Sequence, residues 1–170
     1  MLRSFIVSAV FVLILGTHAY ADEPTRLMKY FSYFEGQWQV TDLHGGRKGS
    51  LTIRRGEGGT SHVLEYRLGE ERRTELWGYD PTTKNWTAVG FAQNGERYLQ
   101  VMTEVPKHET PKPGDRWSDK HEGVLPSGET TSSQLDFLIE SKDSYVVKVI
   151  KSTVGESKQE DRATKITRQR

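Results

Sequence analysis

The chain has 170 residues, with 24 Lys and Arg against 23 Asp and Glu, a net charge of +1 and a mean hydropathy of −0.68. Its charges are interspersed rather than gathered into a basic stripe, so no nucleic-acid partner is predicted. The absence of cysteine excludes disulfides, a lipid anchor on a cysteine and thiol chemistry.

Residues 1–21 have the pattern of a signal peptide. Arg3 precedes an apolar run from Phe5 to Leu15, and Ala19-Tyr20-Ala21 has the small-x-small form of a cleavage site. The run is shorter than the roughly 20 apolar residues that a membrane span requires, although an uncleaved anchoring helix is the alternative. We expect cleavage near Ala21/Asp22 and a periplasmic or secreted domain of residues 22–170, without a membrane span.

One short helix is predicted ahead of the strands. Its apolar stripe has helical spacing and consists of Leu27, Tyr30, Phe31 and Phe34. Thr25 is the expected N-cap, and Gly36 is expected to end the helix. Because a helix of about two turns is marginal alone, we expect its aromatic face to pack into one end of a barrel.

After the helix, turn signals recur at the spacing typical of an all-β fold. The expected strands cover residues 37–43, 50–56, 61–68, 72–79, 86–93, 97–105, 116–124, 131–140, 144–153 and 163–169. Asn94-Gly95 predicts a type I′ turn, and the proline-rich segment 106–115 predicts a surface loop.

These short connections favour an up-and-down antiparallel barrel of about ten strands, closed at one end by the helix. An open sandwich is the alternative, since turn spacing alone does not separate the two. Alternation predicts one buried face, which carries Leu64 and Tyr66 in the segment 61–68. Segments 72–79 and 97–105 carry apolar residues on both faces, so their inward faces are left open.

Several short motifs occur in a recognisable order: Gly36-Gln37-Trp38, Gly78-Tyr79-Asp80-Pro81, Trp86, Asn94-Gly95 and Thr167-Arg168. Together they resemble an uncharacterised bacterial family of exported, lipocalin-like barrel proteins, known only as a domain of unknown function. The resemblance covers residues 27–169 and implies a calycin-type barrel but no activity. In lipocalins the tryptophan of the first strand packs under an arginine of the last, which implies a structural latch between Trp38 and Arg168, with Arg162 as the alternative.

The nitrobindin-like haem barrels resemble this chain in their tryptophan-led first strand. They bind haem through a histidine in the C-terminal part, whereas no histidine follows His121 here. Gln39-Val40-Thr41 also replaces their glycine-rich continuation after the tryptophan. No cofactor is therefore predicted.

Other chemistry has little support in the sequence. The histidines after residue 21 have no metal-binding spacing, so no metal site is predicted. Ser61 and His62 are neighbours whose side chains point to opposite faces of a strand and cannot pair as nucleophile and base. No catalytic residue is predicted and no enzymatic activity is assigned.

The leading prediction is a barrel that binds or carries a small hydrophobic molecule, because barrels of this size can hold such a ligand. The candidate ligand-binding residues are His62, Leu64, Tyr66, Leu76, Tyr98, Met102, Phe137 and Tyr145. The alternative is an interaction protein with a solid barrel and an outer patch of Trp77, Tyr79 and Phe91. A cavity of about 300 Å³ or more would favour the ligand.

Overall fold

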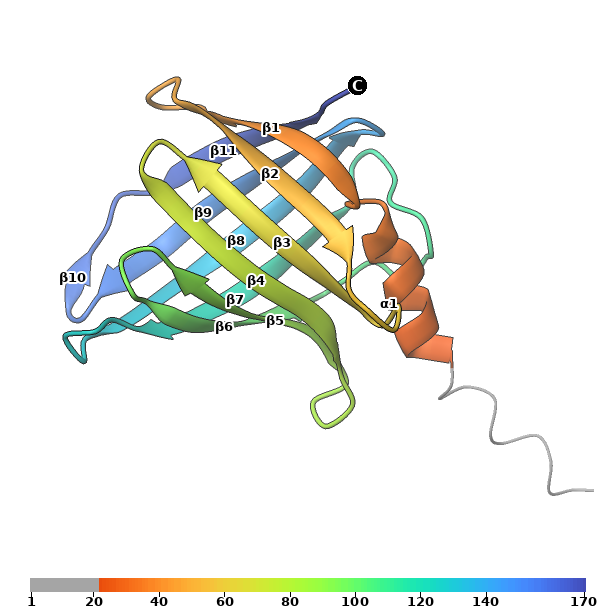
Figure 1. Cartoon of the computed structure of the whole chain (residues 1–170), viewed down its shortest axis with the longest axis horizontal. Helices are drawn as coiled ribbons and strands as arrows, with labels where there is room; N and C mark the ends of the chain where they lie inside the picture. Colours follow the sequence, from red (N-terminus) through yellow and green to blue (C-terminus); the bar gives the residue numbers. More distant parts are fainter. Residues whose placement is uncertain (1–21) are drawn as a thin grey trace, which may run out of the picture.

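The computed structural model describes residues 22–170 (Figure 1), and the predicted signal peptide lies outside the described residues. The elements are α1 (Asp22–Ser32), β1 (Gly36–Asp42), β2 (Lys48–Arg55), β3 (Ser61–Leu68), β4 (Glu71–Asp80), β5 (Asn85–Ala92), β6 (Arg97–Thr103), β7 (Arg116–Val124), β8 (Thr130–Ser141), β9 (Ser144–Val154), β10 (Ser157–Lys158) and β11 (Arg162–Arg168).

The strands form one closed antiparallel barrel. Each strand from β1 to β8 pairs with the next, β8 pairs with β9, and β11 lies between β9 and β1 to close the ring. The two-residue β10 is an extra strand beside β9. The predicted all-β, up-and-down barrel of about ten strands with a short helix at one end is therefore confirmed, and the sandwich alternative is wrong.

Helix α1 fills one end of the barrel with aromatic rings. Leu27, Tyr30, Phe31 and Phe34 are all buried, as their spacing predicts. Phe31 stacks on Trp86 with ring centroids 4.8 Å apart, and Phe34 meets Tyr145 edge to face at 5.1 Å. This end is therefore a packed core and leaves no space for a ligand.

Three local predictions are wrong. Helix α1 ends at Ser32, so Gly36 does not end the helix and instead begins β1. Helix α1 begins at Asp22, so Thr25 lies within its first turn and is not its N-cap. Gly95 has a positive φ of 84°, but Asn94 does not, so Asn94-Gly95 is not a type I′ turn. Instead the Gly95 amide donates to the Ala92 carbonyl at 2.9 Å, within a four-residue connection between β5 and β6. The longer loop lets glycine alone take the left-handed conformation.

Strands β4 and β6 resolve the two faces that the sequence leaves open. On β4, Trp77 points into the barrel and Leu76 points outward, where it is 49% exposed. On β6, Tyr98 and Met102 point inward and Leu99 points outward. The prediction that Leu76 lines the interior is therefore wrong, because strand alternation places it on the opposite face from Trp77.

Arg168 joins the last strand to the first. Its guanidinium carbon lies 4.0 Å from the centroid of the Trp38 ring, and Nη1 donates to the Glu35 carbonyl at 2.9 Å. Nη2 donates to the Tyr33 carbonyl, just beyond the end of α1. One side chain thus ties β11 to β1 and to the segment that follows the helix.

We predict that Arg168→Met lowers the free energy of unfolding by about 2 kcal/mol, because it removes a cation–π contact and leaves two partly buried carbonyls without this donor. Urea unfolding followed by tryptophan fluorescence measures the change. Arg170→Met is the matched control, since the Arg170 side chain is 90% exposed. Equal stability of the two variants would show that the latch is not stabilising.

Candidate functional site

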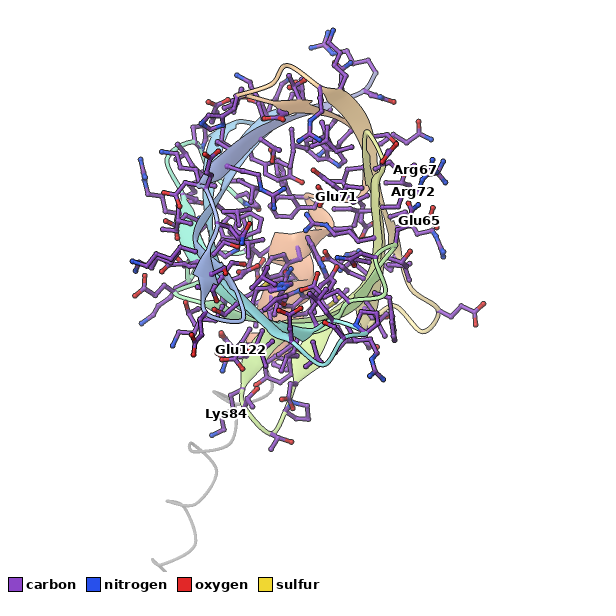
Figure 2. All side chains as sticks on the ribbon, turned by 90° about the vertical axis from the view of Figure 1, so that its left-hand side faces the viewer. Glu65, Arg67, Glu71, Arg72, Lys84 and Glu122 are labelled. Carbon is purple, nitrogen blue, oxygen red and sulfur yellow. The ribbon has the colours of Figure 1, made fainter. Side chains whose placement is uncertain are left out.

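The barrel interior is open at the end opposite α1. Figure 2 looks into this end, with α1 visible at the far side. A cavity of about 550 Å³ lies here, among residues of β3, β4, β8, β9 and β11 and the turns between strands. A small void of about 30 Å³ lies deeper in the barrel. The void has room for one or two water molecules, whereas the cavity matches the usual size of a ligand site.

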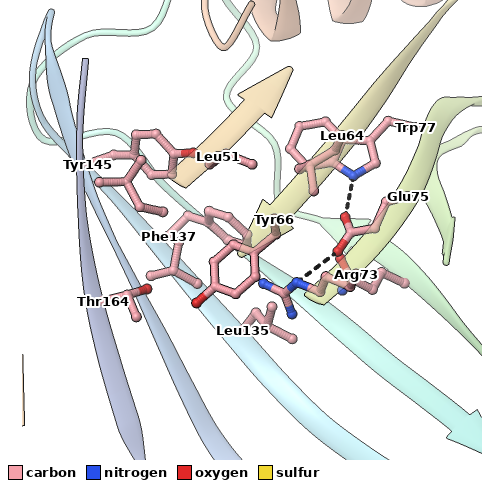
Figure 3. A pocket seen from close by; sticks show the side chains of 13 residues that line it. Leu51, Leu64, Tyr66, Arg73, Glu75, Trp77, Leu135, Phe137, Tyr145 and Thr164 are labelled. Carbon is pink, nitrogen blue, oxygen red and sulfur yellow. Dashed lines mark hydrogen bonds and ion pairs between the residues drawn. The ribbon is translucent and has the colours of Figure 1, made fainter. Parts of the chain in front are cut away.

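Five residues line both spaces and form the floor of the large cavity: Tyr66, Arg73, Leu135, Val147 and Thr164. Figure 3 shows Tyr66 lying beside the Arg73 guanidinium, with the Tyr66 hydroxyl directed across the barrel toward Thr164. We call these five residues the cavity floor. Its polar groups, on Tyr66, Arg73 and Thr164, lie between the large cavity and the small void.

Arg73 is the charged group of the cavity floor. Its guanidinium carbon lies 4.3 Å from the centroid of the Tyr66 ring, and Nε lies 3.3 Å from Oε1 of Glu75. Burial by itself would lower the pKa of Arg73, but Glu75 together with Tyr98, Tyr66 and Glu71 raises it overall, so the side chain stays cationic. The buried Nε of Arg73 has no hydrogen-bond partner, and neither terminal nitrogen donates a hydrogen bond to any residue in the described range 22–170.

Glu75, in contrast, has its acceptors occupied. Its Oε1 accepts from the Tyr98 hydroxyl at 3.0 Å, and Oε2 accepts from Trp77 Nε1 at 2.6 Å. The side chain is only 3% exposed, so these neutral donors replace the water that a carboxylate needs. Burial, followed by the charge of Glu75, raises the pKa of Tyr98, which therefore remains a donor.

A second polar cluster lies on the wall beside this pair. His121 Nε2 lies 3.2 Å from Oε1 of Glu96, which also accepts from the Thr131 hydroxyl. The hydrogen bond from His121 is the main cause of a lowered pKa of Glu96, so this carboxylate is ionised. Gln100 Nε2 lies 3.5 Å from His121 Nδ1, which leaves both ring nitrogens engaged. These contacts hold the His121 and Glu96 side chains in place, and neither ring nitrogen of His121 is left without a partner.

Gly90 makes room for Tyr98 between the two clusters. The two residues are cross-strand partners, and a Cβ built on Gly90 would lie 2.3 Å from the Tyr98 ring. Any larger residue at position 90 would displace the ring that donates to Glu75.

The walls above the cavity floor combine apolar side chains with the His121 cluster, and the rim is polar. Leu68 and Val149 contribute to the wall, while hydroxyl groups of β8 and β9 lie near the rim. Ion pairs cross the rim, including Arg162 with Glu71 at 3.9 Å. A molecule held here would contact charge at its inner end, apolar wall along its length and water at its outer end.

The predicted ligand-binding residues are distributed over several environments. Tyr66 lines the large cavity, and Leu64, Phe137 and Tyr145 reach only the small void. Tyr98 lies between Glu75 and His121. Met102 is part of the packed core, and Leu76 is on the outer surface.

His62, one of the predicted ligand-binding residues, is buried at the end of the barrel that α1 fills and does not line the cavity. Its Nε2 lies 3.0 Å from Oε1 of Glu35, which also accepts from Arg55 Nε at 2.9 Å. Burial lowers the pKa of His62 despite the nearby carboxylate. The partner, Glu35, lies in the short segment between α1 and β1.

Sequence reasoning missed Arg73, Glu75 and His121. Arg73, Glu75 and Trp77 share one face of the segment 72–79, so strand alternation could have identified Arg73 and Glu75 as interior residues. The apolar Leu76 and the charged residues gave opposite signals for that segment, because an interior arginine contradicts the usual apolar-inward pattern.

The outer surface carries an aliphatic patch, which differs from the aromatic patch of the alternative prediction. Leu76, Val89 and Leu99 are exposed and lie in register across β4, β5 and β6, with Phe91 beside them. Trp77 is inside the barrel and Tyr79 packs against the core, so the expectation that both are exposed is wrong. Their strand faces the interior at these positions.

Searches for relatives give no identity. No protein-family model matches this chain, and no curated protein has a significant match. In residues 22–170, no three His, Asp or Glu side chains are grouped so that they could hold a metal ion. None of the helices in this range is long and apolar enough to cross a membrane. The fold and cavity thus define the chain as a β-barrel with an internal pocket.

Asp119 is a fully buried carboxyl group on the inner face of β7. Neither of its oxygens has a hydrogen-bond partner among the described residues. Burial and then the negative charge of Glu75 raise its pKa well above that of an ordinary aspartate. The folded protein therefore keeps a proton on Asp119 over a pH range in which the unfolded chain has released it.

We predict that Asp119→Asn changes how stability depends on pH. The stabilisation from the raised pKa is complete below the ordinary aspartate pKa and is lost as the pH rises through the folded-state value. The variant should therefore resemble the wild type near pH 4 and be more stable by about 1–3 kcal/mol near pH 8, as measured by urea unfolding. Asp161→Asn is the control, since Asp161 is exposed. A difference that does not vary with pH would contradict the prediction.

Proposed function

We propose that this protein binds a small amphiphilic molecule inside the open half of its barrel and carries it in an exported, soluble form. The observation that supports this most is the cavity of about 550 Å³, which exceeds the size that favours a ligand. Export is proposed from residues 1–21, and membership of the lipocalin-like family from the motifs in residues 27–169.

The lining of the cavity supports an amphiphilic ligand in place of the purely hydrophobic one that the sequence suggests. A hydrocarbon would cover Arg73 and the hydroxyl of Tyr66 without giving them partners, and buried polar groups without partners are unfavourable. A fully polar molecule would leave the apolar side chains of Leu135 and Val147 on the cavity floor without an apolar group to contact.

The cavity is on the inner face of the barrel, so a substitution that fills it tests the proposal. We predict that Val147→Phe weakens binding of the uncharged fluorescent probe 1-aminoanthracene by about tenfold or more, because the added ring occupies the cavity floor. Fluorescence titration measures the dissociation constant, and a thermal melt reports whether the variant is folded.

Val89→Phe is the matched control, since it makes the same substitution on the exposed outer face of β5. It should leave probe binding unchanged. Equal weakening by both substitutions, or no saturable binding to the wild type, would exclude the interior as the binding site.

A further inference from the structure

We propose that the inner end of the ligand is a carboxylate, which binds head-first to Arg73 on the cavity floor. This inference rests on the proposed function and adds the chemical class of the ligand. The essential observation is that Arg73 has free donors on both terminal nitrogens among the described residues, and faces the cavity with a 24% exposed side chain.

The guanidinium is held in a fixed orientation. Tyr66 stacks against it at 4.3 Å, and Glu75 lies 3.3 Å from its Nε. With Nε turned toward Glu75, the guanidinium presents its two terminal nitrogens as a planar fork. A carboxylate has the matching geometry because its two oxygens can accept from the fork in parallel.

Glu75 neutralises Arg73 only in part. Its two oxygens also accept hydrogen bonds from Tyr98 and Trp77, so its negative charge is shared with two neutral donors. Because neutral donors occupy the oxygens of the buried glutamate, the N–H groups of the neighbouring arginine can donate to another acceptor. The free N–H groups of Arg73 therefore select an acceptor, and a charged acceptor gives the stronger hydrogen bonds.

The surroundings of the fork provide further contacts for the same head group. The hydroxyls of Tyr66 and Thr164 belong to the cavity floor, and neither is hydrogen-bonded within residues 22–170. Burial raises the pKa of Tyr66 to about 12, so its hydroxyl remains a donor at neutral pH. A carboxylate at Arg73 would place its apolar body against Leu135 and Val147 and direct its other end toward the rim.

The experiment compares ligands that differ only in their head group. Isothermal titration measures the dissociation constants of decanoate, decyl sulfate and decan-1-ol with the full mature domain, residues 22–170. The wild type should bind decanoate at least about tenfold more tightly than decan-1-ol, and more tightly than decyl sulfate. Arg73→Met should abolish the preference for decanoate and retain binding of decan-1-ol.

Two further variants keep the test informative even if Arg73→Met is unstable. Arg73→Met/Glu75→Gln removes both charges of the pair together and should show the same loss of preference. Glu75→Gln alone removes the competing charge, so the preference for decanoate should rise by about threefold or more. A structural role of Arg73 would not produce this gain.

Arg72→Met is the matched control, because Arg72 precedes Arg73 on β4 and is exposed on the outer face of the barrel. It should leave the preference intact. Binding of decan-1-ol without a preference for decanoate would overturn the carboxylate proposal alone, and a preference for decyl sulfate would do the same. Failure of all three ligands and of the uncharged probe would overturn the cavity function itself.

Discussion

The aromatic packing of α1 against the closed end of the barrel is the constraint on which the rest of the interior depends. Phe31 and Phe34 insert between the rings of Trp86, Trp117 and Tyr145 and fill this end of the barrel. Since the barrel has a continuous wall, filling one end leaves the other as the only route inward along the part of the chain that the structure describes. The position of the cavity follows from the position of the helix.

The polar groups of the interior lie immediately beyond that packing. A buried ion pair such as Arg73 with Glu75 is weak evidence for stability, because the loss of hydration can exceed the attraction between the charges. Leucines in these positions would have filled the barrel more simply. The unused donors of Arg73 and the protonated carboxyl of Asp119 therefore fit an interior whose packing is not optimised for stability alone.

Much of the architecture could be predicted from the sequence. Helical spacing of Leu27, Tyr30, Phe31 and Phe34 indicated the plug, and turn residues at regular intervals indicated the strands. Closure followed from the short connections between them. These signals are local, and each one depends on residues that lie close together in the chain.

The site was predicted less well because its residues contradict the local pattern. Alternation on β4 could be satisfied with Leu76 inward or with Arg73 and Glu75 inward, and ordinary hydrophobicity favoured the wrong choice. His62 was correctly expected inside, but the depth of a residue along the barrel depends on strand tilt and on the helix that fills one end. Those are properties of the closed sheet and have no local signal.

Both ends of the described chain lie at the closed end of the barrel, beside α1. Arg168, two residues from the C-terminus, contacts the segment after α1, and the helix itself begins the described chain (Figure 1). The mouth of the cavity is formed by hairpin turns and by the connection between β9 and β11. A surface, a label or a second protein joined to Asp22 or to the segment after Arg168 would therefore hold the barrel by its base and leave the mouth of the cavity facing solvent.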